Sequence, residues 1–406
     1  MKDKLSIKPE NMNVLTINSG SSSIKFALYG IDGPLKRILY GKLDRIGIKG
    51  TYLEFNNLKK KQKGNLRIEL TDFKSLANFL IDWLEKQVDF SLITGIGHRV
   101  VHGMQHSEPE LITPDLLKEL SHITSYDLDH LPAEIELVKA FRQHHSNIPQ
   151  IACFDTAFHQ TMPRRAKLLP IPRRFDAKGI QRYDFHGLSY SYLMEELTRI
   201  AGYDATQGRI ILAHLGSGAS MAAVYNGKSI DTSMGFTPAG GLIMGTRPGD
   251  LDPGVAWYIM KSEKVSPKQF NTLINHECGL LGVSETSSDM QDLLESQKND
   301  IRAAETVELF CYQAKKWIGA FSAALGGLDT LIFSGGMGEN APEIRSRICE
   351  GLEFLGINID EKQNKTNAPV ISTNKGRITV RVIHTDEEWM IAKTVNQMIN
   401  NIKDNT

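Results

Sequence analysis

The sequence predicts an α/β protein made of two similar domains, and two observations lead to this prediction. Residues 13–29 form two β-rich runs around a turn of Gly and Ser, and residues 209–225 repeat this pattern with Gly20 aligned on Gly216. Elsewhere, strand-like runs alternate with helical periodicity, which favours sheets covered by helices. The length of 406 residues fits two domains of about 100–200 residues each. Because two copies are too few for a solenoid, we interpret them as a duplicated α/β domain.

Local patterns predict the other elements in chain order. Thr113 and Pro114 provide a helix cap and a first-turn proline, and apolar residues at helical spacing around Val138 indicate a second helix. From Val307 to Leu325 the apolar spacing is that of a long helix, which we interpret as a core helix rather than a cofactor-binding stripe. Strands are predicted at residues 150–154, at 330–334 and around 378–382, the long helix should end at Gly326-Gly327, and the lysine-rich residues 57–64 should form an exposed hairpin tip.

The composition excludes several classes of protein. Lys plus Arg and Asp plus Glu both number 47, so a broad nucleic-acid or membrane surface is not expected. The four cysteines form no Cys-x-x-Cys pair, which argues against a zinc site or a disulfide framework. The N-terminus lacks the apolar core of a signal peptide, and no apolar run is long enough to span a bilayer. We therefore expect a cytoplasmic protein without nucleic-acid or membrane partners.

The small-residue turn of the first hairpin predicts phosphate binding. Small side chains let backbone N–H groups approach an oxyanion, Ser21 and Ser23 add hydroxyl donors, and Lys25 adds positive charge. Asn18 stands just before the turn. Such turns also close ordinary hairpins. The second copy makes a pair of phosphate-binding turns the better interpretation.

Two charged residues stand at predicted strand ends. Asp155 follows the strand at residues 150–154, and a carboxylate there can bind Mg²⁺ or orient a reacting oxygen. A helix cap or turn is the alternative. Arg99 offers a planar fork for a carboxylate or phosphate, with a structural salt bridge as the alternative. The flanking His98 and His102 have metalloprotease spacing but lie on a predicted strand and lack the motif's Glu, so no metal is expected there.

Three further segments carry candidate residues. His186 stands beside an aromatic residue and a turn glycine. Residues 231–253 contain five glycines and three prolines, which predicts a shaped loop presenting Arg247. Near the end of the chain, a helix cap at Thr385 completed by Glu388 is as good an interpretation as a metal ligand.

Familiar nucleotide-binding motifs are absent or weak. Residues 227–229 read Gly-Lys-Ser, but Ala222 stands where a P-loop needs its first glycine. Residues 336–341 fit Gly-x-Gly-x-x-Ala after a strand, which alone is a weak dinucleotide signal. We interpret this segment as a glycine-rich turn against which a nucleoside can pack.

The combination of these segments resembles the acetate kinase family. Residues 13–29 and 231–253 look like its two signature motifs, and shorter segments recur in the family's order. The resemblance spans nearly the whole chain. It implies the actin and sugar-kinase type of fold, with two ribonuclease H-like domains around a central nucleotide cleft. The domains would be residues 1–158 plus 388–406 and residues 159–387. The shorter segments are 97–103, 153–163, 183–187, 214–218, 336–340 and 385–388.

The resemblance also implies roles for individual residues. Asp155, His186 and Arg247 would be catalytic, and Arg99 would bind the substrate carboxylate. The metal, Mg²⁺ or Mn²⁺, would bind Asn18 and Glu387. A small apolar substrate pocket would be lined by Val101, Leu128, Phe185 and Pro238. The nucleotide, ATP or ADP, would be surrounded by Lys25, Ser21, Ser23, His214, Leu215, Gly216, Ser217, Gly218, Asp289, Met290, Gln291, Gly336, Met337, Gly338, Glu339 and Asn340.

The implied reaction is reversible phosphoryl transfer from ATP to acetate, in a homodimer by family analogy. The acceptor is already a carboxylate near pH 7, so Asp155 is better interpreted as a metal-shell or positioning residue than as a general base. The chain departs from the family pattern at Ser217, at Gln291 and at residues 129–131, but every implied catalytic and metal residue is present. Propionate kinase activity is the close alternative. A nucleotide-binding switch on an actin-like fold and a dehydrogenase built on residues 336–341 are the others.

Overall fold

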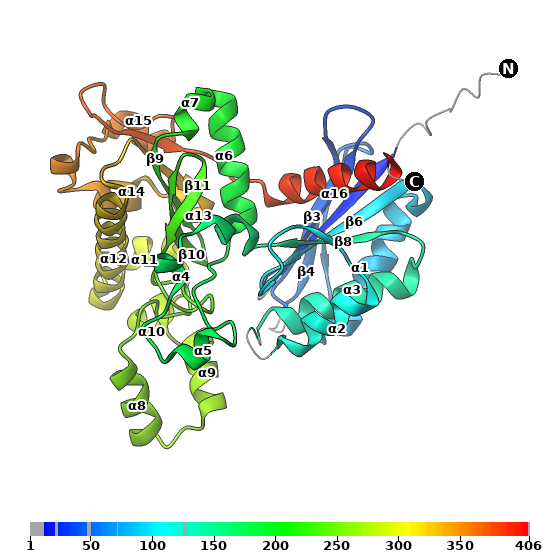
Figure 1. Ribbon diagram of the computed structural model, residues 1–406, viewed down its shortest axis with the longest axis horizontal. Helices are drawn as coiled ribbons and strands as arrows, with labels where there is room; N and C mark the ends of the chain where they lie inside the picture. Colours follow the sequence, from blue (N-terminus) through cyan, green and yellow to red (C-terminus); the bar gives the residue numbers. More distant parts are fainter. Residues whose placement is uncertain are drawn as a thin grey trace. The chain divides into compact units, whose positions relative to one another are not determined.

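The computed structural model describes residues 12–20, 23–46, 50–70, 72–124, 127 and 129–404 (Figure 1). Contacts within the chain divide it into two compact units, which are described separately. Unit 1 comprises Met1–Ala157 and Asp386–Thr406, and unit 2 comprises Phe158–Thr385. The expected domain boundaries, after residues 158 and 387, stay a prediction about folding domains.

Unit 1 contains an eight-stranded sheet with the strand order β5-β4-β3-β2-β1-β6-β8-β7. Antiparallel pairing connects β5 through to β1, whereas β1, β6 and β8 run parallel to one another. The strands are β1 Asn13–Ser19, β2 Ser23–Gly30, β3 Lys36–Asp44, β4 Tyr52–Asn57, β5 Gln62–Arg67, β6 Ile93–Val100, β7 Glu110–Leu111 and β8 Gln150–Phe154.

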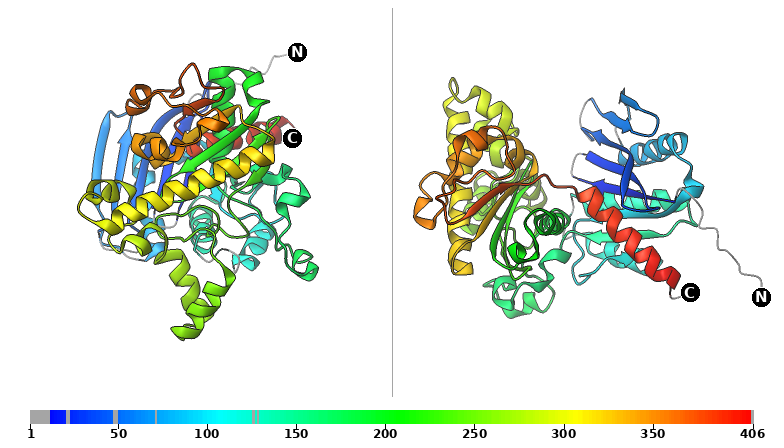
Figure 2. Two further views of the ribbon diagram at one scale, coloured as in Figure 1. Left: turned by 90° about the vertical axis from the view of Figure 1, so that its left-hand side faces the viewer. Right: turned by 90° about the horizontal axis from the view of Figure 1, so that it is seen from above.

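Helices cover both faces of the parallel part of this sheet. The helices of unit 1 are α1 Phe73–Gln87, α2 Pro114–His122, α3 Leu131–His144 and α16 Glu387–Asp404. Successive residues of a strand point to opposite faces. On β6, His98 contacts Phe141 of α3 edge-on, whereas the preceding residue, Gly97, faces α16. Helix α16 is the red helix at the C-terminus in Figure 2. A Cβ atom at Gly97 would lie 2.3 Å from Cγ2 of Ile391. Glycine is therefore what lets the C-terminal helix pack directly on β6.

Unit 2 contains a five-stranded sheet with the order β11-β10-β9-β12-β13. On one face, Tyr190, Leu193 and Leu197 of α6 form a core cluster with Ile210 and Leu212 of β9. The long helix α12 contacts β9, β10 and β11 from the other side (Figure 1). The strands are β9 Arg209–Leu215, β10 Ala219–Tyr225, β11 Lys228–Thr232, β12 Thr330–Ser334 and β13 Thr379–Val382. The helices are α4 Arg164–Lys167, α5 Arg173–Asp176, α6 Gly187–Ala201, α7 Tyr203–Thr206, α8 Pro253–Ser262, α9 Pro267–His276, α10 Gly279–Ser284, α11 Met290–Ser296, α12 Ile301–Leu325, α13 Gly335–Asn340, α14 Pro342–Cys349 and α15 Glu361–Lys365.

The two sheets share one topology, which confirms the predicted duplication. In each, three antiparallel strands are followed by two parallel strands, as β3-β2-β1-β6-β8 and as β11-β10-β9-β12-β13. The hairpin registers differ by one residue, because Tyr29 pairs with Val14 whereas Tyr225 pairs with Arg209, the equivalent of Asn13. Tyr29 is 1% exposed and Tyr225 is 46% exposed. The repeat therefore predicts the topology but not the surroundings of each side chain.

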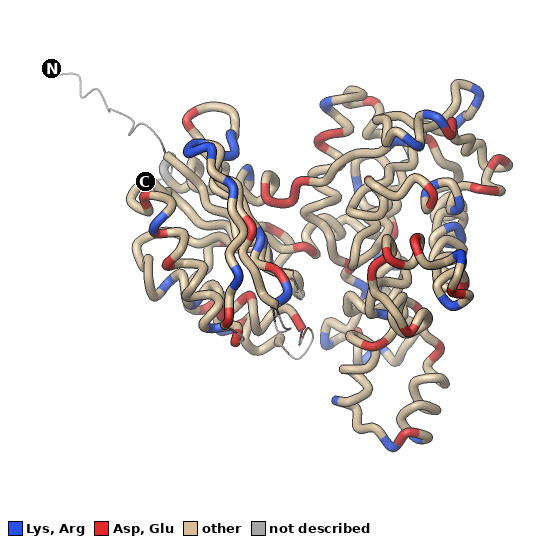
Figure 3. The backbone as a smooth tube through the Cα atoms, turned by 180° about the vertical axis from the view of Figure 1, so that it is seen from behind, with Lys and Arg blue, Asp and Glu red and all other residues tan. Residues whose placement is uncertain are grey.

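Most of the predicted elements are confirmed. Thr113 accepts the N–H of Leu116 at the start of α2, and α12 ends at Gly326 with φ +69°. Strands β8 and β12 have the predicted bounds, and the lysine-rich tip between β4 and β5 is exposed. Figure 3 shows cationic and anionic residues interspersed along both units. Among the described residues, no helix combines the length and apolar character needed to cross a membrane.

Two local predictions are wrong. The glycine-rich segment after β12 is not a turn but the short helix α13. Thr385 does not cap α16, because the N–H of Trp389 donates to Asp386 Oδ1 at 2.9 Å, while Thr385 Oγ1 lies 2.8 Å from Ser189 Oγ. In both cases tertiary contacts decide the local structure.

Candidate active site

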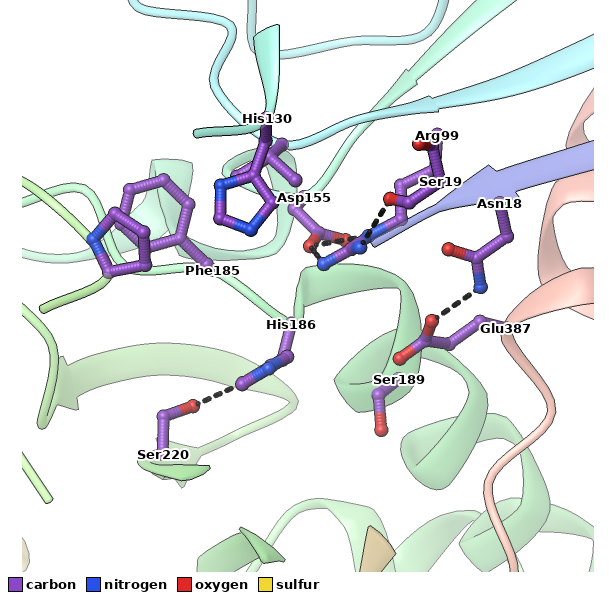
Figure 4. A network of polar contacts seen from close by, with 12 residues as sticks. Asn18, Ser19, Arg99, His130, Asp155, Phe185, His186, Ser189, Ser220 and Glu387 are labelled. Atoms are coloured by element: carbon purple, nitrogen blue, oxygen red, sulfur yellow. Dashed lines mark hydrogen bonds and ion pairs between the residues drawn. The ribbon is translucent and has the colours of Figure 1, made fainter. Parts of the chain in front are cut away.

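Neighbouring strands place Arg99 and Asp155 in contact in unit 1 (Figure 4). Arg99 lies near the end of β6, and Asp155 directly follows β8. The Nε and Nη2 atoms of Arg99 donate to Asp155 Oδ2 at 2.9 and 2.5 Å, and Nη1 donates to the Ser19 carbonyl oxygen at 3.0 Å. The Asp155 side chain is fully buried, and that of Arg99 is 12% exposed. The structure thus brings these two separately predicted residues together, and the salt bridge considered as the alternative for Arg99 is present.

Arg99 remains a charged donor in this setting. Burial lowers the pKa of its guanidinium, but the carboxylates of Asp155 and Glu387 raise the pKa above its ordinary value. A guanidinium has five N–H groups, and three are used in the bonds to Asp155 and Ser19. The two remaining N–H groups can bind an anion, and a planar fork suits a carboxylate best.

Asn18 joins two carboxylates of α16. Its Nδ2 donates to Glu387 Oε2 at 2.8 Å (Figure 4). It also donates to Glu388 Oε1 at 2.9 Å. Asn18 and Glu387 are 4% and 9% exposed. Mg²⁺ prefers hard oxygen ligands and is often held by one or two carboxylates, with phosphates and waters completing its shell. An amide oxygen and two carboxylates fit this ion. Glu388 belongs to this cluster rather than to the predicted capping box.

The turn of the first hairpin differs in part from the expectation. The N–H of Gly20 donates to the Ser23 carbonyl oxygen at 2.7 Å, so it closes the turn and does not face a phosphate. Ser21 lies outside the described residues. Lys25 lies on β2 at the edge of a groove of about 570 Å³ on the outer face of β2–β5. The other cations of this groove are Arg37, Lys42 and Lys63.

The expected substrate-pocket residues are distributed over both units. Val101 directly follows β6 in unit 1 and is 2% exposed. Phe185 and Pro238 are buried in unit 2, and the carbonyl oxygen of Pro238 accepts a long hydrogen bond of 3.4 Å from Arg247. Leu128 lies outside the described residues.

His186 of unit 2 has an unusual backbone and a fixed ring. It precedes α6 with φ +59°, and Asp184 has φ +60°. Left-handed backbone costs about 1–3 kcal/mol for residues other than glycine and clusters at functional sites. The Nδ1 atom of His186 lies 3.0 Å from Ser220 Oγ (Figure 4), and its ring stacks on that of His214 with 4.3 Å between centroids. The two predicted histidines are therefore in contact.

The β9–β10 turn is enclosed by two other glycine-containing segments. A Cβ atom at Gly216 would lie 3.9 Å from the backbone nitrogen of Gly336 at the start of α13. On another side, the N–H of Gly245 donates to the Ser217 carbonyl oxygen at 3.0 Å. The segments 214–218 and 336–340 predicted to surround the nucleotide thus adjoin one another, with little side-chain bulk between them.

Several side chains that are expected to surround the nucleotide form hydrogen bonds within unit 2. Glu339 Oε1 accepts the N–H groups of Gly335 at 2.9 Å and Thr385 at 3.0 Å. Asp289 caps α11 by accepting the N–H of Gln291 at 2.8 Å. These contacts indicate that the two acidic side chains shape the surrounding backbone.

The loop carrying Arg247 has the predicted irregular form. Residues 233–252 contain neither helix nor strand. Two glycines with positive φ, Gly249 and Gly279, allow close approach to other backbone. A Cβ atom at Gly249 would lie 2.5 Å from the Gly241 carbonyl oxygen, and a Cβ atom at Gly279 would lie 2.1 Å from the Met244 carbonyl oxygen. The N–H of Met244 donates to the carbonyl oxygen of Arg247 at 3.0 Å. The backbone of Arg247 is thereby fixed.

Comparisons with known proteins identify the family of this chain. The sequence pattern of the acetokinase family matches residues 13–393. The chain belongs to the acetokinase family. Acetate kinase of Thermoanaerobacterium thermosaccharolyticum is 41% identical over 404 residues, which cover 97% of this chain and 100% of that protein. That of Thermotoga maritima is 39% identical over 404 residues, covering 96% and 100%.

Solved acetokinase structures have the same fold. The crystal structure of Porphyromonas gingivalis acetate kinase matches with a TM-score of 0.84 and 36% identity over 96% of this chain and 100% of that one. A propionate kinase from Francisella tularensis matches with a TM-score of 0.88 and 35% identity over 95% and 99%. The expected α/β architecture of the actin and sugar-kinase type is therefore confirmed.

Three polar residues that contact expected site residues were not predicted from the sequence. Ser220 and Ser189 bond to the rings of His186 and His214, the latter at 2.8 Å. Glu134 of α3 accepts the N–H of Val101. A signal existed for Glu134, because it shares the apolar face of α3 on which Val138 and Phe141 were predicted. The two serines carry no comparable pattern.

Proposed function

We propose that this chain catalyses reversible phosphoryl transfer from ATP to acetate, producing acetyl phosphate and ADP. The observation that supports this proposal is the buried Arg99–Asp155 pair in a chain of the acetokinase family. The Arg99 guanidinium of this pair is charged and has two N–H groups that bond neither to Asp155 nor to Ser19. Arg99 binds the acceptor carboxylate. That carboxylate attacks the terminal phosphorus of ATP, the bond to the ADP oxygen breaks, and no proton has to be removed from the nucleophile.

Asp155 positions Arg99 in this proposal. Its Oδ2 accepts two hydrogen bonds from the guanidinium, which fixes the plane of the fork at the end of β6. A general base is not required, since a carboxylic acid with an ordinary pKa near about 4 is ionised at neutral pH. Asp155 therefore contributes orientation and charge balance.

Asn18 and Glu387 would hold Mg²⁺, with Glu388 as an additional carboxylate. The bound ion neutralises charge on the phosphates of the nucleotide. The proximity of both carboxylates to the Asn18 amide supports this role, because an oxygen-rich set of this kind suits Mg²⁺. Mn²⁺ has similar ligand preferences and is expected to substitute.

His186 and Arg247 would stabilise the charge of the transferring phosphoryl group. The contacts of the His186 ring with Ser220 and His214 limit its movement, which favours stabilisation by a preorganised donor. The glycine-rich segments 214–218 and 336–340 would surround the nucleotide. Lys25 and Ser23 would contact its phosphates.

The preferred acid is proposed to be acetate, with propionate as the competitor. One methylene in an apolar pocket changes transition-state binding by only about 1–3 kcal/mol, and a structure titled propionate kinase is among the similar proteins. The test is trapping of the acyl phosphate with hydroxylamine in the presence of ATP, Mg²⁺ and acetate, propionate or butyrate. A higher kcat/KM for propionate would refute the choice of acetate, and no hydroxamate from any acid would favour a nucleotide-binding switch.

A homodimer is proposed through the α8–α9 segment of unit 2. Trp257 and Tyr258 of α8 are 66% and 70% exposed, and neither α8 nor α9 contains a buried residue. Exposed aromatic side chains of this size are enriched at protein interfaces. Sedimentation should give twice the mass of the chain, and Trp257→Glu should reduce it to one chain. The cytoplasmic location stays a prediction.

A further inference from the structure

A buried carboxyl group lies next to the expected substrate pocket. Glu134, on the first turn of α3, is 3% exposed. Its Oε1 and Oε2 atoms accept the N–H of Val101 at 3.3 and 3.1 Å. Carboxylates are rarely buried to this degree without a reason in structure or function.

The Val101 N–H has a particular place in unit 1. β6 ends at Val100, whose carbonyl oxygen accepts the N–H of Asp155 at 3.0 Å. Val101 is the next residue and is 2% exposed, so its N–H needs a partner within the protein. Glu134 supplies that partner from another element. It therefore fixes the backbone two residues after Arg99.

Charged groups of both signs surround Glu134. Asp127 precedes α3, with its Oδ1 2.9 Å from His130 Nδ1, while Asp155, directly after β8, and Arg99 of β6 act on the Glu134 carboxyl group with opposite sign. Burial raises the pKa of Glu134 well above its ordinary value, and the Asp127 charge raises it further. A neutral carboxyl group can still accept the Val101 N–H. An ionised one would add a negative charge where the substrate carboxylate must bind.

We propose that Glu134 is a positioning residue of the carboxylate site, which fixes Val101 beside Arg99 without contributing a charge that opposes the substrate. This inference rests on the proposed function, because it requires the acceptor carboxylate at Arg99. Glu134 should therefore affect the affinity for acetate and not the rate of phosphoryl transfer. Substrate affinity then also depends on the protonation of a group that the substrate does not touch.

Three substitutions at this position test the proposal. Glu134→Gln retains an acceptor for the Val101 N–H and has no charge, so KM for acetate should stay within about twofold of the wild type. Glu134→Leu removes the acceptor at similar size and should raise KM for acetate at least about tenfold, with kcat and KM for ATP within about threefold. Glu134→Asp shortens the side chain and should also raise KM for acetate. If the Glu134→Leu variant does not fold, the Glu134→Asp variant tests the proposal in its place.

The pH dependence of affinity provides a second readout. KM for acetate in the wild type should rise as pH increases through the pKa of Glu134, and this rise should be absent in Glu134→Gln. Asp127, His130, Asp155 and Glu387 remain in both proteins, so the difference between the two profiles isolates Glu134.

The outcomes separate this inference from the proposed function. If the wild type does not phosphorylate any short-chain acid, the proposed function fails. If the wild type is active but the Leu and Asp variants keep the wild-type KM for acetate, the role of Glu134 is refuted. A glutamine variant with the KM of the leucine variant would also refute it, since the charge would then be required.

Discussion

Replacement of Arg99 by alanine removes two things at once, the fork proposed to bind acetate and the partner of Asp155. The structure separates their consequences. Two N–H groups of the guanidinium are left for a ligand, while the Nε and Nη2 bonds, at 2.9 and 2.5 Å, neutralise a carboxylate that is fully buried. Substrate affinity and stability should therefore both fall, for different reasons.

The magnitudes follow from these contacts. Hydrogen bonds to charged groups contribute about 1.5–3 kcal/mol each, so the loss of even one such bond to acetate should raise KM for acetate roughly 10- to 150-fold. Leaving the Asp155 carboxylate buried without its partner should lower the free energy of unfolding by about 3–5 kcal/mol. The KM for ATP should change much less, because Arg99 is proposed to bind the acceptor carboxylate and not the nucleotide.

The assay measures hydroxamate formation at saturating MgATP over a range of acetate concentrations, together with urea unfolding of each protein. Arg99→Lys is the matched control, since it retains the charge and loses the planar fork, and it should have an intermediate KM. In Arg99→Ala combined with Asp155→Asn, much of the lost stability should return. A KM for acetate within about twofold of the wild type in Arg99→Ala would mean that the carboxylate binds elsewhere.

Three further predictions concern other parts of the protein. Arg247→Ala should lower kcat by orders of magnitude while nucleotide binding, measured by calorimetry, persists; near-normal turnover would reject its role in the transition state. Glu387→Gln should raise the Mg²⁺ concentration for half-maximal activity at least about tenfold, and an unchanged Mg²⁺ titration would contradict the metal site. Burial lowers the pKa values of His98 and His159 to about 3, so the folded state keeps them neutral while the unfolded chain binds protons below pH 6.5. Stability should fall as the pH decreases, by about 2 kcal/mol per histidine between pH 8 and pH 5. His98→Gln should remove the contribution of His98 to this pH dependence, which urea unfolding at several pH values measures. A pH profile of stability identical to that of the wild type would refute this origin.

Much of the fold could be predicted because its signals are local. The two hairpin patterns predict the shared topology, and the Gly326 end of α12 and the Thr113 cap of α2 depend only on neighbouring residues. The one-residue difference in hairpin register could not be predicted, because strand pairing is decided by tertiary packing. The cap of α16 at Asp386 was missed because Thr385 bonds instead to Ser189.

The site was predictable where strand ends determine positions. Arg99 and Asp155 were each found because they stand at a predicted strand end. The parallel pairing of β6 with β8, which brings these ends together, is seen only in the structure. Residues that depend on distant partners were harder to find from local patterns. Asn18 and Glu387 are 369 residues apart and were paired only through the family resemblance. Glu134 was missed although it lies on the apolar face of α3, because its proposed role depends on a bond to the backbone N–H of Val101.

In the proposed reaction, a carboxylate oxygen of acetate attacks the terminal phosphorus of ATP. Acetate labelled with ¹⁸O, ATP and Mg²⁺ are incubated with the enzyme, and the product is trapped with hydroxylamine, which attacks the acyl carbon and releases phosphate with the bridging oxygen. Each phosphate released should contain one ¹⁸O atom, and the nucleotide product should be ADP. Label in AMP, or phosphate without label, would contradict the proposed reaction.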